Sequence, residues 1–74
     1  MPKITNEKLV LTIGQNINRL RKERGWSQEE LGEKMGISRQ QASKYLLGHN
    51  ILDVVAMHKL CKIFKVDINE LYRG

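Results

Sequence analysis

The sequence predicts an all-α fold, a compact domain of five short helices. Three observations support this prediction. Apolar residues recur at intervals of three and four along most of the chain, as they do on one face of a helix. A serine or aspartate stands three residues before a glutamate or glutamine ahead of several apolar runs, which is the capping box of a helix start. Finally, the chain contains no Asn-Gly or Asp-Gly pair to close a β-hairpin.

Length and composition narrow the possible classes of protein. A chain of 74 residues is the size of one small domain, and 41% apolar residues is enough for a core. Residues 1–5 are expected to be a short flexible lead-in to a domain over residues 6–74. Because no apolar run approaches about 20 residues, no membrane span is expected. A single cysteine, Cys61, excludes an internal disulfide and predicts a reducing, cytoplasmic location.

The first helix is predicted over roughly residues 6–24. Asn6 would cap an early start, and Thr12 would cap a late one. Gly14 weakens the middle by about 1 kcal/mol relative to alanine, which keeps the late start open. Gly25 is expected to end the helix. The apolar stripe consists of Leu9, Val10, Ile13, Ile17 and Leu20.

A tight corner between two short helices follows. Ser27 begins a capping box ahead of a helix over residues 28–35. Gly36 closes that helix in a left-handed conformation, and Ser38 begins a second capping box ahead of a helix over residues 39–47. Such a short connection leaves room only for a sharply angled helix pair.

Residues 28–47 therefore predict a helix-turn-helix motif, whose second helix can lie in a DNA major groove. The net charge of +5 favours a polyanionic partner but is weak evidence alone. The polar residues of the second helix are suited to reading bases, because arginine pairs with guanine O6 and N7 and glutamine with adenine N6 and N7. The base-reading candidates are Arg39, Gln40, Gln41, Ser43 and Lys44.

Two more helices are predicted to complete the domain. The fourth begins after Asp53 and ends near Phe64. The fifth is short, with Asp67 as its cap and Glu70 completing the capping box.

Taken together, these segments resemble the Cro and phage-repressor helix-turn-helix family over residues 13–72. Residues 26–37, WSQEELGEKMGI, resemble the family's S/T-Q-x-x-L-A-x-x-x-G-(I/V/L) motif, with Gly32 where the family usually has alanine. Residues 17–25 resemble its basic first helix, 38–48 its recognition helix and 53–71 its closing helices.

The resemblance implies a lambda-repressor-like domain that binds double-stranded DNA as a homodimer on a palindromic operator. The leading hypothesis is a transcriptional repressor, with activation left open. Phosphate contacts are expected from Gln28 at a helix start and from Asn50 in the loop after the recognition helix. The other phosphate candidates are Ser38, Arg19 and Lys22, although a solvated face is an equally good explanation of the first helix's charges.

An alternative function comes from apolar residues where the family often has charged residues or proline. They could hold a partner protein, as in an antitoxin that also regulates its own synthesis. These residues are Leu46, Leu47, Ile51, Leu52 and Val55. An enzyme is not expected, because the acids are explained by capping and no nucleophile stands with a base. No cofactor or metal is expected either, since His58 and Cys61 have no second ligand pair at zinc spacing.

Overall fold

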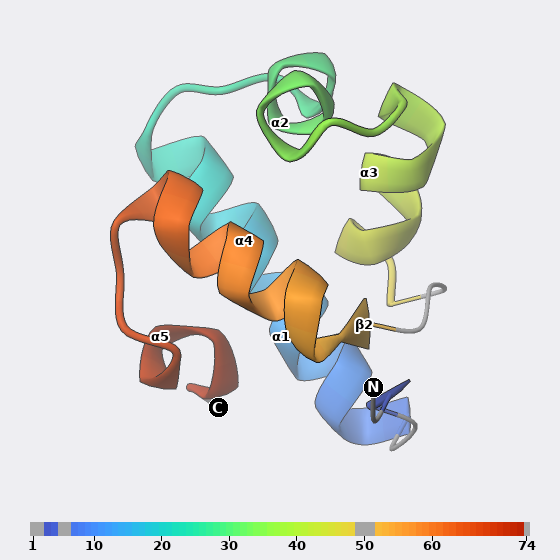
Figure 1. Ribbon diagram of the computed structural model, residues 1–74, viewed down its shortest axis with the longest axis vertical. Helices are drawn as coiled ribbons and strands as arrows, with labels where there is room; N and C mark the ends of the chain where they lie inside the picture. The colour runs from blue at the N-terminus through green and yellow to red at the C-terminus, as the bar shows by residue number, and fades with distance from the viewer. Residues whose placement is uncertain (1–2, 5–6, 49–51, 74) are drawn as a thin grey trace.

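A computed structural model of the chain describes residues 3–4, 7–48 and 52–73 (Figure 1). Its elements are β1 (Lys3–Ile4), α1 (Glu7–Glu23), α2 (Gln28–Met35), α3 (Arg39–Leu46), β2 (Leu52–Asp53), α4 (Val54–Phe64) and α5 (Asn69–Tyr72). The predicted five-helix, all-α class is confirmed. Within the described parts of the chain, no helix is long and apolar enough to cross a membrane.

The core lies where α1 packs against α3, α4 and α5. α1 begins at Glu7, which agrees with the early one of the two predicted starts and rules out the late one at Thr12; the early cap itself, Asn6, lies outside the described residues. The apolar stripe of α1 is buried at Ile13, Ile17 and Leu20. The other fully buried large side chains come from α2, α4 and α5, namely Leu31, Met57, Leu60, Phe64 and Leu71.

Hydrogen bonds at the starts of α2 and α3 confirm the predicted capping box of α2 and, of the second predicted box, the Ser38 cap of α3. Ser27 Oγ accepts a hydrogen bond from Glu30 N at 3.0 Å, and the Glu30 carboxylate accepts one from Ser27 N at 3.1 Å. Gly36 adopts the left-handed conformation, with φ of 73°. Ser38 Oγ accepts from Gln41 N at 3.2 Å. Local hydrogen bonding therefore fixes where α2 ends and α3 begins.

An aromatic stack fixes the position of α2. The rings of Trp26 and Phe64 stack with centroids 5.3 Å apart. Lys34 Nζ lies 4.5 Å from the Trp26 ring centroid, and the Arg24 guanidinium lies 5.2 Å from that of Phe64. Trp26 is thus an anchor between α2 and α4.

The start of α5 differs from the prediction. Asp67 Oδ1 accepts from Asn69 N at 2.9 Å, but the helix begins two residues after Asp67 and has no side-chain cap. The Glu70 carboxylate does not complete a capping box; it lies 3.4 Å from an Arg19 nitrogen and 3.3 Å from one of Arg73. Its charge is better balanced by two guanidinium groups than by one backbone N–H.

Two residues of the expected lead-in are paired. Lys3 lies opposite Asp53 and Ile4 opposite Leu52 in a two-residue antiparallel ladder. The sequence predicted a loose segment here, because a ladder this short leaves no alternating pattern to detect. The pairing ties the beginning of the chain to the segment that precedes α4.

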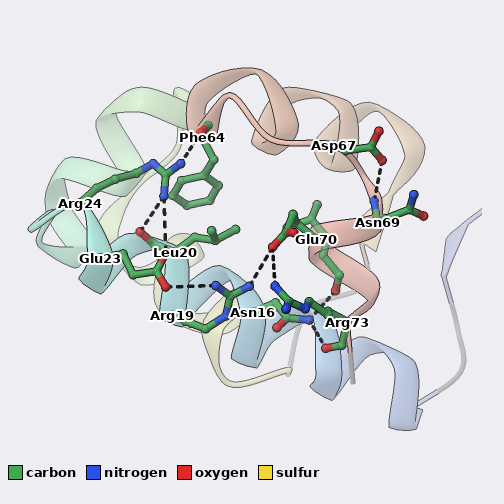
Figure 2. A network of polar contacts seen from close by, with 11 residues as sticks. Asn16, Arg19, Leu20, Glu23, Arg24, Phe64, Asp67, Asn69, Glu70 and Arg73 are labelled. Atoms are coloured by element: carbon green, nitrogen blue, oxygen red, sulfur yellow. Dashed lines mark hydrogen bonds and ion pairs between the residues drawn. The ribbon is translucent and has the colours of Figure 1, made fainter.

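A buried asparagine fastens α5 to α1 (Figure 2). Only 8% of Asn16 is exposed, and its Nδ2 donates to Leu71 O at 2.8 Å and to Arg73 O at 2.6 Å. These carbonyls belong to the end of α5, where a helix has no donors of its own. The Asn16 amide therefore donates hydrogen bonds to both of these carbonyls at the end of α5.

Candidate nucleic-acid interface

The first turn of α2 and the outward face of α3 enclose an open hollow. Its lining residues are Gln28 from α2 and Arg39, Gln40, Ser43 and Lys44 from α3. The structure thus brings together four of the five predicted base-reading residues and the leading phosphate candidate. Gln41, the fifth, is also exposed on α3.

The orientation of α3 follows from its apolar residues. Ala42 is fully buried and Leu46 is 8% exposed, while Tyr45 packs half-buried against the core. Because 3.6 residues make one turn, burying this face turns Gln40 and Lys44 to the opposite side. The core positions on α3 therefore determine which side chains are free to meet a ligand.

The hollow is suited to an anionic ligand with hydrogen-bonding edges. Arg39 and Lys44 supply positive charge, and α3 carries no acidic residue to offset it. Gln28 is the first residue of α2, where free backbone N–H groups and the helix dipole favour an anion. Exposed arginine and glutamine side chains can each form bidentate hydrogen bonds with a base edge.

Arg19 and Lys22 do not line the hollow. Arg19 Nη1 lies 3.1 Å from Glu23 Oε2, and its Nη2 lies 3.4 Å from Glu70 Oε2 (Figure 2). Those contacts direct the guanidinium towards α5, which Figure 1 places on the opposite side of the molecule from α3. Lys22 is exposed in the last turn of α1.

Two predicted phosphate-contacting residues remain, and the structure describes only one of them, Ser38. Ser38 is exposed at the N-cap of α3, with its hydroxyl oxygen accepting from Gln41 N. Asn50 lies outside the described residues.

The apolar set proposed to hold a partner protein is not one surface. Leu46 is buried in the core, so its inclusion was wrong: it lies one turn after Ala42 and shares its buried face. Leu47 and Val55 are 56% and 54% exposed. Ile51 lies outside the described residues, and Leu52 contributes backbone to β2.

Metal-binding chemistry has little support where the structure describes the chain. No three His, Cys, Asp or Glu residues gather there as a possible metal site. Cys61 is half-buried, and burial raises the pKa of its thiol, with a smaller contribution from the Asp67 carboxylate. A raised pKa keeps the thiol protonated and a poor ligand or nucleophile.

Two residues of α1 have structural roles that the sequence analysis missed. Asn16 holds the end of α5, and its signal was a polar residue on an otherwise apolar helix face. Gly14 is buried where α1 meets α3, with the position of its missing Cβ only 2.6 Å from Tyr45 O. From the sequence alone, Gly14 was expected only to weaken the helix, because a contact with another helix has no effect on the local helix propensity.

Comparison with known proteins places this geometry in a family. Residues 17–71 match the family described as HTH_3, helix-turn-helix. The chain is 30% identical over 56 residues to the uncharacterized HTH-type transcriptional regulator YgzD of Bacillus subtilis (strain 168), covering 76% of this chain and 85% of that protein.

Two solved structures are also similar. The restriction-modification controller protein C.AhdI of Aeromonas hydrophila superimposes with a TM-score of 0.79 at 27% identity, covering 85% of this chain and 96% of that one. SinR, the master regulator for biofilm formation, was solved in complex with DNA; it gives a TM-score of 0.69 at 33% identity, covering 80% and 95%.

Proposed function

The chain belongs to the helix-turn-helix family of DNA-binding transcriptional regulators, and from this premise we propose that it is a repressor that binds a two-fold symmetric operator as a dimer. As a member of that family it is a DNA-binding protein and not an enzyme. The observation that carries the proposal is the hollow that joins Gln28 to the outward face of α3.

In the proposed complex, α3 lies in the major groove and its exposed side chains read base edges. Arg39 pairs with a guanine, and Gln40 with an adenine. Lys44 lies one turn after Gln40 and reaches the same side of the groove. Gln41 and Ser43 contact neighbouring bases or phosphates.

Phosphate contacts position α3 and provide much of the affinity. Gln28 and Ser38 each stand at a helix start, where backbone N–H groups favour an anion. Lys22 adds an exposed positive charge, and Asn50 remains a prediction. Arg19 is left out of the proposed set, because its guanidinium is already shared between two carboxylates.

The size of the domain supports dimeric binding. Half-sites read by paired recognition helices lie about 34 Å apart, one turn of DNA. The domain measures 28 × 22 × 19 Å, and its described residues form one helix of this kind. One copy cannot reach both half-sites, so a palindromic operator requires two copies.

Alanine variants of the hollow test base reading. Arg39→Ala and Gln40→Ala should each lose about 1–3 kcal/mol at one or two base pairs of an operator selected with the wild-type protein. Gln15→Ala is the matched control, since Gln15 is an exposed glutamine on α1. If both α3 variants kept the affinity and base preference of the wild type, the base-reading assignment would be wrong.

A second candidate function is the antitoxin-like protein. Its support is now limited to the exposed Leu47 and Val55. A small protein that copurifies with the chain and is lost from the variant Leu47→Ser/Val55→Ser would favour it. A dimer that binds duplex DNA equally well with and without these two substitutions would count against it.

A further inference from the structure

We propose that the hollow selects guanine: Arg39 and Lys44 each bind the N7 and O6 atoms of a separate guanine, so that every half-site of the operator contains at least two guanines. The inference rests on the proposed function, in which α3 lies in the major groove. It goes further by naming the base edges that the groove must present. It also assigns a specific base to Lys44 and leaves the cytosine amino group without a charged partner.

The two positively charged side chains of the hollow carry only hydrogen-bond donors. Neither the Arg39 guanidinium nor the Lys44 ammonium has an acceptor atom. In the major groove, guanine presents two neighbouring acceptors, N7 and O6. Adenine presents an acceptor beside a donor, thymine an acceptor beside a methyl group, and cytosine only a donor. A side chain that has donors alone therefore matches guanine better than any other base.

A charged acceptor, which a cytosine amino group would need, is missing from the hollow. α3 contains no acidic residue. α2 carries Glu29, Glu30 and Glu33, but none of the three lines the hollow, and the Glu30 carboxylate is already bound in the α2 capping box. Cytosine is read directly when a carboxylate accepts a hydrogen bond from its N4 atom. The acceptors that do line the hollow are neutral amide and hydroxyl oxygens, which favour cytosine far less.

The donors of Arg39 and Lys44 are not used by the fold. Other basic side chains are used in this way: Arg21 donates to Trp26 O at 2.6 Å, and Lys59 donates to a backbone carbonyl at the end of α2 at 3.1 Å. Within residues 3–4, 7–48 and 52–73, no carboxylate forms an ion pair with Arg39 or Lys44. No internal ion pair has to break before these two side chains bind a base, so their preference for guanine is expressed in full.

The test replaces each guanine of one half-site, in turn, with 7-deazaguanine or with inosine. 7-Deazaguanine has a C–H group in place of N7 but still pairs with cytosine. Inosine keeps N7 and O6 and lacks only the amino group that guanine presents in the minor groove, so it is the matched control. Affinity for each duplex, at one salt concentration, is measured for the wild type, Arg39→Ala and Lys44→Ala. Both substituted residues are exposed, and circular dichroism checks that each variant is folded.

We expect 7-deazaguanine at two positions of the half-site to weaken binding of the wild type roughly tenfold each, for the loss of one hydrogen bond to a charged group. Inosine at the same positions should leave the affinity unchanged. At one of the two positions 7-deazaguanine should have no further effect on Arg39→Ala, and at the other no further effect on Lys44→Ala. A side chain that contacts a phosphate instead would give losses that add at every position.

The proposal is overturned if the selected half-site contains fewer than two guanines, or if 7-deazaguanine changes the affinity no more than inosine does. It is also overturned if the loss in Lys44→Ala adds to that of 7-deazaguanine at every position, because Lys44 would then contact no guanine N7. A symmetric operator that gives any of these results refutes this inference alone. A wild-type protein that selects no symmetric duplex refutes the proposed function, and this inference with it.

Discussion

Replacing Asn16 with leucine tests whether one buried side chain holds α5 on the domain. Leucine has a similar size and keeps the helix propensity of α1, but it cannot donate a hydrogen bond. The substitution leaves Leu71 O and Arg73 O without the donor that each has in the wild type.

The expected loss follows from how buried the two carbonyls are. Leaving a buried acceptor without its partner costs about 1–3 kcal/mol. The bond to Leu71 O is buried, whereas that to Arg73 O is only partly buried, so water can replace part of the second. We therefore expect Asn16→Leu to lower the free energy of unfolding by about 2–4 kcal/mol. Because a domain of this length has roughly 4–11 kcal/mol in total, the effect is large.

Urea unfolding at fixed protein concentration measures this loss. Trp26 fluorescence reports the aromatic stack on Phe64, and far-ultraviolet circular dichroism reports the helices. Gln15→Leu is the control, since it makes the same kind of change at the preceding position of α1, which is exposed. If Asn16→Leu destabilised the protein no more than Gln15→Leu, the two hydrogen bonds would not hold α5 as argued.

Three further predictions follow from the caps, the charges and the thiol. Ser27→Ala removes one half of the α2 capping box and should lower stability by about 1 kcal/mol, seen as a lower melting temperature; an unchanged temperature would contradict the capping. Lys22→Ala should reduce the slope of log affinity against log salt by about 1, while Arg19→Ala leaves the slope unchanged; the reverse order would reassign the phosphate contacts. Alkylation of Cys61 at pH 8 should be slower in the folded protein than in urea, because its raised pKa leaves less thiolate. The unfolded thiol ionises first as pH rises, so the contribution of Cys61 to stability is present below its ordinary pKa and is lost as pH rises through the raised value. Equal alkylation rates would contradict that shift.

The parts of the fold that the sequence predicted well are those that local hydrogen bonds determine. The start of α2 depends on Ser27 and a glutamate three residues later, and its end depends on Gly36; both signals lie within one turn of the boundary they mark. The exposed residues of α3 were predicted from their polarity, and the structure turns them outward because Ala42 packs into the core on the other side of the helix.

What the sequence could not predict depends on residues far apart in the chain. Arg19 was predicted to contact a phosphate, but in the folded chain its guanidinium lies beside the Glu70 carboxylate of α5. The Asn16 amide also has its hydrogen-bond partner in α5, and β1 pairs with a strand about 50 residues away. Neither contact can be recognised from a local stretch of sequence. Leu46 is a different case, because its spacing from Ala42 already indicated burial and the apolar composition around it obscured that signal.

The most direct test of the central claim is selection of binding sites from random duplex DNA with the full chain, with the stoichiometry of the selected complex measured by light scattering. We predict a two-fold symmetric site whose half-sites lie about one helical turn apart, bound by two copies of the chain. Selection of a site without two-fold symmetry, or a complex with one copy per duplex, would contradict the account.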